Sequence, residues 1–391
     1  MKRGGKTSFL GFLALLGLGL VVMLLAPRAA QAYPQWQFSA GATRCNQCHY
    51  APTGGGLING YGRDAIGEEL STWQGDGAFL HGAADLPRVL KLGLDLRFAM
   101  LSNDNGGPDQ PKNAFFPMQL DAHVRLEAGA FAFQGIVGGR AQVRSADAPV
   151  PQSNFQPESG SRLVSREHWA IWQPAARGMY VRAGRFFAPF GLRLAEHLVY
   201  VRRDLGFNIL EETYNVSAGF LDNGWEAHLT LFAPDFLQNG SQETGVAAYA
   251  ERRVLNELAS VAVQGRFASR EGAQRGIGGV VLKGYIEPAR LLVMGEGNYI
   301  QNMPEGVDAV GQFAGLLGAS WLPPLRGFLV TLWGERLQTD LATQNTALNA
   351  LTGLVSWFPY PHFELQLVAR HQAADGARAM TTLLAQLHYF L

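Results

Sequence analysis

The sequence predicts an all-β fold: a transmembrane antiparallel β-barrel of about 16 strands, preceded by a small segment of helices and loops. Charged residues make up only 16% of the 391 residues, whereas hydrophobic residues make up 47%. Beyond residues 1–32, no apolar run is long enough to form a transmembrane helix. From Leu86 onward, however, apolar and polar residues alternate in many segments of about ten residues, which is typical of membrane-spanning strands.

The N-terminus has the pattern of an export signal. Three basic residues lie among the first six, an apolar run covers 9–26, and Ala30-Gln31-Ala32 offers a cleavage site flanked by small residues. We expect residues 1–32 to be removed as a signal peptide. The apolar run is long for such a peptide, so an uncleaved membrane anchor is the alternative.

The charge balance argues against nucleic acid as a partner. Cleavage would remove four of the 32 basic residues and leave 28 basic against 32 acidic residues, a net charge of −4. Nucleic-acid-binding domains need a basic field, which this mature chain would lack.

The only two cysteines of the chain lie in Cys45-Asn46-Gln47-Cys48-His49. A Cys-x-x-Cys-His run is the signature of covalent haem attachment, in which two thiols join the haem vinyl groups and the histidine is the proximal iron ligand. It predicts one haem c bound by Cys45, Cys48 and His49, in a cytochrome segment that covers 33–86. About 54 residues bury too little surface for a robust independent core, so we expect this segment to pack in or against the barrel.

Other uses of the cysteine pair fit less well. A thioredoxin-like disulfide would need a βαβ context, which is absent. A zinc site would need four ligands, and no second cluster of cysteines or histidines lies nearby. A haem enzyme such as a peroxidase, with an open iron site, is a further alternative.

The sixth iron ligand has two candidates. Within 33–86, His81 is the only histidine outside the motif, and no methionine occurs there. His81 is therefore the first candidate, and His123, on the predicted lumen face of a strand, is the second. Met100 and Met118 fall in the predicted lipid-facing series and are poor candidates.

The barrel is predicted to occupy residues 87–391. In its first two strands, apolar residues at every second position would face lipid, and the residues between them would face the lumen. The lumen-facing set includes Lys91, Asp95, Arg97, Asp121, Arg125 and Glu127. The predicted strands cover 89–100, 118–126, 130–144, 161–173, 177–187, 213–221, 223–233, 245–253, 256–267, 277–286, 290–301, 310–321, 326–338, 349–358, 362–371 and 380–391.

The segments between these strands differ in length and composition. The predicted extracellular loops are the longer polar stretches 102–115, 145–160, 188–212, 234–244, 302–309 and 339–348. Glu287-Pro288-Ala289 and Pro323-Pro324-Leu325 are predicted periplasmic turns. Aromatic residues near strand ends predict girdles at the two membrane interfaces: Trp169, Trp172, Trp225, Trp321, Trp333, Trp357, Phe358 and Tyr360.

The last segment resembles the terminal strand of outer-membrane barrels. Thr382, Gln386 and His388 would face the lumen. Such strands usually end in phenylalanine, whereas here Phe390 is penultimate and Leu391 is last.

Taken in order, these features resemble the fused monohaem c-type cytochrome–porins of the bacterial outer membrane, of the iron-oxidising type. The resemblance rests on the export signal, the single haem motif, a segment that ends in Asn59-Gly60-Tyr61-Gly62-Arg63, and the barrel. Separately, Gly184-Arg185-Phe186-Phe187-Ala188-Pro189-Phe190-Gly191-Leu192 is similar to a segment of the phosphate-selective porin O and P superfamily. The best known cytochrome–porins take electrons from ferrous iron outside the cell. No residue here identifies iron as the substrate, so iron(II) oxidation rests on this analogy alone.

The resemblance implies an electron-transfer protein of the outer membrane, in contact with its lipid. Its partners would be a periplasmic c-type cytochrome or other electron carrier, and an extracellular electron donor or acceptor. Since the apolar band of such a barrel is about 25 Å tall, we expect the haem in the lumen or at its periplasmic side. The alternative is a solute porin whose haem segment acts as a gate, a plug or a redox sensor.

Overall fold

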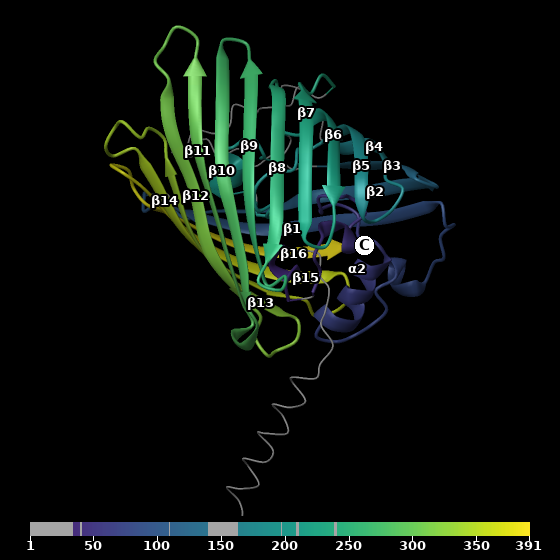
Figure 1. Cartoon of the computed structure of the whole chain (residues 1–391). Coiled ribbons are helices and arrows are strands. Elements are labelled where there is room, and N and C mark those ends of the chain that lie inside the picture. The colour runs from purple at the N-terminus through teal and green to yellow at the C-terminus, as the bar shows by residue number, and fades with distance from the viewer. Residues whose placement is uncertain are drawn as a thin grey trace, which may run out of the picture.

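The computed structural model describes residues 34–391, apart from 40, 109, 140–162, 197, 209–210 and 238–240. Within these residues, 16 strands form a closed antiparallel barrel in which sequence neighbours pair and β1 pairs with β16 (Figure 1). The predicted fold class is therefore confirmed. The predicted signal peptide and the predicted loop 145–160 lie outside the described residues.

The strands follow the predicted segments closely. They are β1 (Leu90–Asp104), β2 (Lys112–Ala128), β3 (Phe131–Gly139), β4 (Leu163–Trp172), β5 (Gly178–Phe186), β6 (Thr213–Leu221), β7 (Trp225–Ala233), β8 (Thr244–Val254), β9 (Ala259–Arg270), β10 (Ala273–Ile286), β11 (Leu291–Pro304), β12 (Val310–Trp321), β13 (Phe328–Gln338), β14 (Ala347–Trp357), β15 (Phe363–Ala374) and β16 (Met380–Phe390). The largest difference is in the first hairpin, where β1 and β2 extend into the predicted loop 102–115.

The helical elements are short. The N-terminal segment contains η1 (Pro34–Trp36), η2 (Cys45–Gln47), α2 (Gly60–Ala65), the π-helical turn η3 (Ile66–Leu70) and η4 (Phe79–Gly82). Two further elements, α3 (Tyr200–Arg203) and η5 (Glu287–Ala289), connect strands. None of the helices in the described part of the chain is long and apolar enough to cross a membrane.

Alternation along each strand separates a lipid face from a lumen face. On β13, Leu332 is 55% exposed, whereas its neighbours Thr331 and Trp333 are buried. Many strands present large apolar side chains outward, among them Val216, Leu229, Leu231, Val263, Leu282, Leu317, Leu351 and Leu367. A closed barrel satisfies its backbone hydrogen bonds internally, and an apolar outer surface is stable in lipid. The chain is therefore a transmembrane barrel of the bacterial outer-membrane type.

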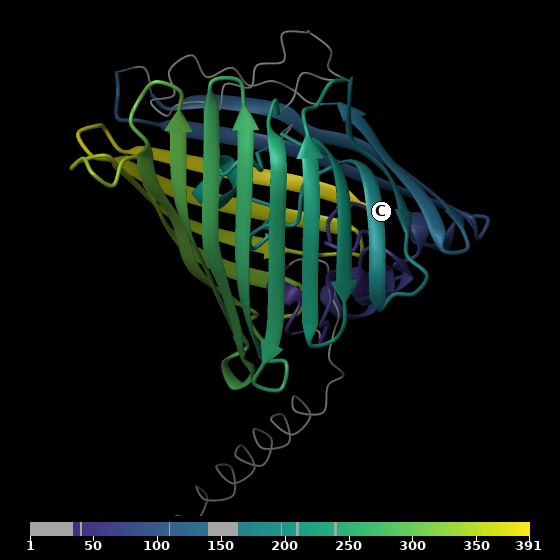
Figure 2. The ribbon, with the colours of Figure 1, turned by 45° about the horizontal axis from the view of Figure 1, so that its top comes forward.

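The two ends of the barrel have different connections. At one end the turns are short, such as 129–130, 222–224 and 255–258, whereas the long connection 187–212 leaves the other end. Short turns are periplasmic in bacterial outer-membrane barrels, which assigns the first end to the periplasm. The N-terminal segment 34–86, here called the plug, lies at this short-turn end (Figures 1 and 2).

The connection 187–212, here called the inner loop, corrects one prediction. An extracellular loop was predicted at 188–212. The connection does leave the end opposite the short turns, but Phe190, Leu192 and Tyr200 are buried in the main apolar cluster together with residues of the lumen wall. Backbone amides anchor it, because the N–H of Leu192 donates to Glu296 Oε2 (2.8 Å) and the N–H of Tyr200 donates to Glu335 Oε2 (2.8 Å). The inner loop turns inward because its apolar side chains match apolar patches on several distant strands.

The prediction of an aromatic girdle is also wrong for three residues. Trp169, Trp333 and Phe358 are almost completely buried, at 1%, 0% and 1% exposure. Trp169 on β4 and Trp333 on β13 lie on the inward face, and Phe358, in the turn after β14, packs against the plug. Other members of the predicted girdle are exposed, namely Trp172, Trp225, Trp321 and Tyr360.

Candidate functional site in the barrel lumen

The side chain of Asn59 braces the turn that holds Cys45 and His49. Its Nδ2 atom donates to three carbonyl oxygens of the motif, those of Asn46 (3.3 Å), Gln47 (3.0 Å) and His49 (3.3 Å). Its Oδ1 atom accepts from the N–H of Gly62 (3.0 Å) and so caps the start of α2. The same side chain therefore fixes both the motif and the helix that follows it.

Helix α2 packs directly on the motif. A Cβ atom at Gly62 would lie only 2.5 Å from the carbonyl oxygen of Cys48, so this position requires glycine. The same carbonyl oxygen accepts from the N–H of Asn59 (2.9 Å), and His49 forms an isolated β-bridge with Ile58. This close approach gives a steric reason for the glycine in Gly62-Arg63, part of the segment that resembles the cytochrome–porins.

The plug is anchored to the short turns of the barrel. The N–H of Thr72 donates to the carbonyl of Phe358 (2.8 Å), and its hydroxyl donates to the carbonyl of Arg326 (2.8 Å). The indole N–H of Trp357 donates to the same hydroxyl (2.9 Å). An apolar cluster adds to these bonds, formed by Trp36, Ile58, Ile66 and Leu70 of the plug with Leu322, Leu329 and Phe358 of the barrel.

Further hydrogen bonds attach the plug to other parts of the wall. Arg253 of β8 donates to the carbonyl of Thr43 (3.1 Å), and Asn46 donates to the carbonyl of Ala176 in the β4–β5 turn (2.7 Å). Arg63 donates to the carbonyl of Leu92 on β1 (2.7 Å). Because these contacts involve distant strands, the plug is seated within the barrel rather than tethered beside it.

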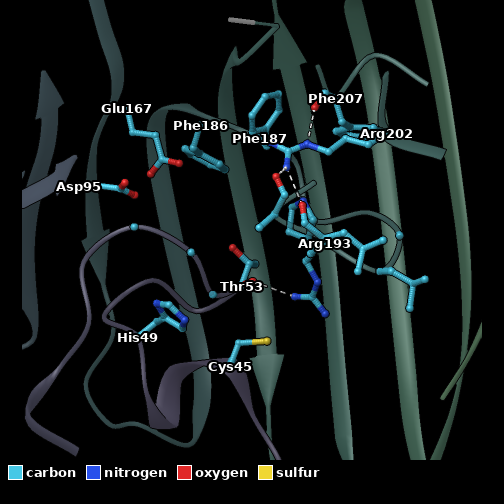
Figure 3. A pocket seen from close by; sticks show the side chains of 18 of the residues that line it. Cys45, His49, Thr53, Asp95, Glu167, Phe186, Phe187, Arg193, Arg202 and Phe207 are labelled. Atoms are coloured by element: carbon cyan, nitrogen blue, oxygen red, sulfur yellow. Dashed lines mark hydrogen bonds between the residues drawn. The ribbon is translucent and has the colours of Figure 1, made fainter. Parts of the chain in front are cut away.

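A cavity of about 320 Å³ lies between the plug and the inner loop. Cys45, Cys48 and His49 line it from the plug, together with Thr53. Aromatic side chains line it from β5 and the inner loop, namely Phe186, Phe187, Phe190 and Phe207. Figure 3 shows Cys45 and His49 facing the same space as the rings of Phe186, Phe187 and Phe207. The volume is within the range of small-molecule and cofactor sites.

The cavity wall is rich in arginine. The arginines that line it are Arg44, Arg97, Arg166, Arg182, Arg193 and Arg202. Several of them have acidic partners: Arg166 Nη1 lies 3.3 Å from Asp121 Oδ2, and Arg193 Nη1 lies 2.7 Å from Glu226 Oε1. Arg193 also donates to the carbonyl of Thr53 (3.2 Å), which joins the inner loop to the plug (Figure 3).

The two thiols are free; Cys45 is partly buried and Cys48 is buried. Cys48 is 2% exposed, and burial, together with the neighbouring Cys45, raises the pKa of its thiol to about 12. Burial also raises the pKa of Cys45. Both thiols are therefore protonated at neutral pH, whereas thiol–disulfide exchange and zinc binding both need the thiolate. The chain therefore presents two neutral thiols at the cavity.

Of the two predicted sixth ligands, the structure brings His123 to the cavity and leaves His81 outside its lining. His123 on β2 is 5% exposed, and neither of its ring nitrogens has a hydrogen-bond partner among the described residues. His81 is exposed in η4 and lies against His362, with ring centroids 5.1 Å apart. The geometry therefore favours the second candidate over the first.

Met118 lines the cavity, which corrects the prediction that it faces lipid. The pairing of β1 with β2 shifts, so that Arg97 pairs with Gln119 whereas Phe98 pairs with Pro117. Met118 is the extra residue of a β-bulge, and such a residue reverses the alternation at that point. The alternation of the sequence alone does not reveal this reversal.

Residues from β5 and the inner loop complete the site and were not predicted. Arg182 and Phe186 lie on the inward face of β5, and the period-two pattern of this strand contains enough information to place them there. Arg193 belongs to a segment without alternation. Only the folded path of the inner loop places it beside Cys45 (Figure 3).

Solved barrels resemble this chain in fold. OprB of Pseudomonas putida has a TM-score of 0.62 at 10% identity, covering 83% of this chain and 99% of OprB. The outer membrane channel DcaP of Acinetobacter baumannii has a TM-score of 0.54 at 10% identity, covering 77% of this chain and 97% of DcaP. An anion-selective porin from Comamonas acidovorans has a TM-score of 0.51 at 10% identity, covering 77% and 99%.

No protein-family model and no curated protein sequence matches the chain. At identities near 10%, the structural likeness establishes the fold alone. The chain has the architecture of a porin-like barrel of the bacterial outer membrane.

Proposed function

We propose that this protein carries one covalent haem c in the lumen of its barrel and passes electrons across the outer membrane. The partners would be an extracellular electron donor or acceptor and, on the other side, a periplasmic c-type cytochrome or other carrier. The observation that carries the proposal is that Cys45, Cys48 and His49 line a cavity inside a membrane-spanning barrel. Ferrous iron is the donor that the family resemblance suggests, and it enters on that analogy alone.

The residues of the cavity fit a haem. Two thiols and an imidazole come from one turn, which is the donor set that covalent attachment requires. A second buried imidazole, that of His123, lines the same cavity, and its ring nitrogens have no hydrogen-bond partner in the described part of the chain. The rings of Phe186 and Phe207 supply an apolar wall. A bound haem would supply one-electron transfer, with a potential set by its axial ligands and surroundings.

The residues that would hold the haem each have a defined role in this proposal. Cys45 and Cys48 would hold the haem as thioethers, and His49 would be the proximal ligand. Asn59 holds the turn that presents these three residues. The barrel would carry the site in its lumen.

Covalent attachment is tested on protein purified from outer membranes. The chain should carry one haem that survives denaturation, measured by intact mass and haem staining. Cys45→Ala with Cys48→Ala should abolish this signal and leave a folded barrel, measured by the heat-dependent mobility typical of such barrels. Wild-type protein without covalent haem would falsify the proposal.

We further propose His123 as the sixth ligand. His123→Ala should convert a six-coordinate low-spin haem to a high-spin form, observed by absorption and electron paramagnetic resonance. His81→Ala is the matched control and should leave both spectra unchanged. If instead Met118→Leu alone changes the spectra, the ligand pair is histidine and methionine, which also predicts a higher reduction potential.

Electron conduction is tested in liposomes that contain an internal reductant and an external oxidant to which the lipid is impermeable. The haem-loaded protein should reduce the external oxidant. The Cys45→Ala, Cys48→Ala protein should not do so, and equal rates for the two proteins rule out the conduit.

The porin fold supports a second candidate, a solute channel in which the plug acts as a gate or redox sensor. Ion conductance that is independent of electron transfer, with no transmembrane electron flow, would favour this second function. The liposome experiment and a planar-bilayer conductance measurement distinguish the two.

A further inference from the structure

Arg182 differs from the other arginines of the cavity in what surrounds its charge. Its side chain is 2% exposed, and its guanidinium carbon lies 3.6 Å from the centre of the Phe186 ring and 5.2 Å from that of Trp169. Its one hydrogen bond to the described residues is a long one, from Nη2 to the hydroxyl of Thr53 (3.5 Å). Its Nε atom has no hydrogen-bond partner among the described residues.

Three other arginines of the cavity are less deeply buried and have stronger acceptors. Arg166 and Arg193 each form ion pairs, and Arg202 donates to the carbonyl of Ala195 (2.9 Å). Within the described residues, no salt bridge joins Arg182 to a carboxylate. Glu167, which also lines the cavity, attracts it electrostatically without forming one. Burying a charge without a partner costs several kcal/mol, so such a site is incomplete without an anion.

We propose that Arg182 is the carboxylate-binding residue of this cavity, and that the carboxylate it binds is a propionate of the haem. This inference rests on the proposed function. Arg182 faces Thr53, which follows the motif on the plug, so a carboxylate held between the two lies in the same cavity as Cys45 and His49. The planar guanidinium presents paired donors that match a carboxylate, and the rings on its faces exclude water from that contact.

A free carboxylate or phosphate solute offers the same oxygen acceptors. The two sources differ in what removes them, because a propionate is lost with the covalent haem and a solute is not. The experiment therefore needs a haem-loaded arm and a haem-free arm.

In the haem-loaded arm, Arg182→Gln is compared with wild type. We expect covalent haem to be retained by mass, a propionate bending band in the resonance Raman spectrum to shift to lower frequency, and the midpoint potential to fall. Arg182→Lys keeps the charge without the paired donors. It should shift the Raman band with a smaller change in potential, and it serves as the readout if the glutamine variant does not fold. Arg252→Gln removes an exposed arginine of β8 outside the cavity and should change neither readout.

In the haem-free arm, the Cys45→Ala, Cys48→Ala protein is titrated calorimetrically with inorganic phosphate and with acetate. Arg182 without its propionate is open to these small anions, so weak binding that depends on Arg182 is expected here, whereas the haem-loaded protein should not bind them at that residue. Haem-loaded variants with unchanged Raman bands and potential overturn the inference while the proposed function stands, and Arg182-dependent phosphate or acetate binding to the haem-loaded protein assigns the site to a solute instead. Wild-type protein without covalent haem overturns both.

Discussion

At the scale of single residues, the site depends on polar side chains that satisfy backbone groups buried by the fold. Asn59 serves the motif in this way, and Glu296 serves the inner loop. A buried backbone carbonyl or amide without a partner is costly, so one such side chain affects stability more than its size suggests. Arg182 shows the opposite situation, in which the chain itself offers too few acceptors.

The role of Asn59 leads to a first prediction. Asn59→Ala removes the cap of α2 and three bonds to the motif, and it should destabilise the plug by about 1–3 kcal/mol. Hydrogen exchange of the amides in 45–63 measures this loss. Asn46→Ala removes a single bond, to Ala176, and should cost less. Equal effects of the two variants would contradict the central role of Asn59.

At the scale of elements, the inner loop depends on a glycine. Gly191 has a φ of +66°, and a Cβ atom there would lie 2.7 Å from both carboxylate oxygens of Glu296. Gly191→Ala should therefore displace the inner loop from the wall, with a positive-φ penalty of roughly 1–2 kcal/mol in addition to the clash. We expect a larger single-channel conductance in planar bilayers.

A matched variant separates the two causes. Gly376 has a φ of +73° in the β15–β16 hairpin, and no atom lies within 4 Å of its Cβ position. Gly376→Ala therefore carries the backbone penalty without the clash and should leave the conductance unchanged. A conductance increase of the same size in both variants would show that contact with Glu296 is not what holds the inner loop.

The elements also show how far sequence reasoning extends. Period-two alternation is a local property of each strand, so it predicted all 16 strands and, for β6 and β12, their bounds to the residue. The bulge at Met118 and the inward path of 187–212 depend on pairing and packing between distant segments. The motif residues were identifiable from spacing, whereas Arg182 and Arg193 join them only through the closed barrel.

At the scale of the whole molecule, the stability of the plug's docking on the barrel depends on pH. His362 in the β14–β15 turn is 0% exposed, and burial, with the charges of His81 and Arg63, lowers its pKa from 6.5 to about 4. When the plug is undocked, the His362 imidazole takes up a proton as pH falls below 6.5. When the plug is docked, the imidazole stays neutral until about pH 4. The docked plug is therefore fully stabilised above pH 6.5. This stabilisation, roughly 3 kcal/mol in all, is lost progressively as pH falls from 6.5 to about 4.

Hydrogen exchange of the plug, corrected for intrinsic pH effects, should show this loss between neutral pH and about pH 4. His362→Phe should reduce the acid sensitivity. His371→Phe, which replaces an exposed histidine of β15, should retain it. Acid sensitivity that persists unchanged in His362→Phe would assign the effect to other groups.

The orientation of the molecule decides from which side the motif is reached. Plug contacts to Arg326 and Phe358 place the motif near the short-turn end, and short turns are periplasmic in bacterial barrels. An epitope inserted in the 305–309 hairpin should therefore bind antibody on intact cells, and one inserted in the 255–258 turn should bind only after the outer membrane is permeabilised. The reverse result would put the plug at the cell surface. A periplasmic carrier would then have no direct access to the cavity from that end. The proposed direction of electron transfer would have to be revised.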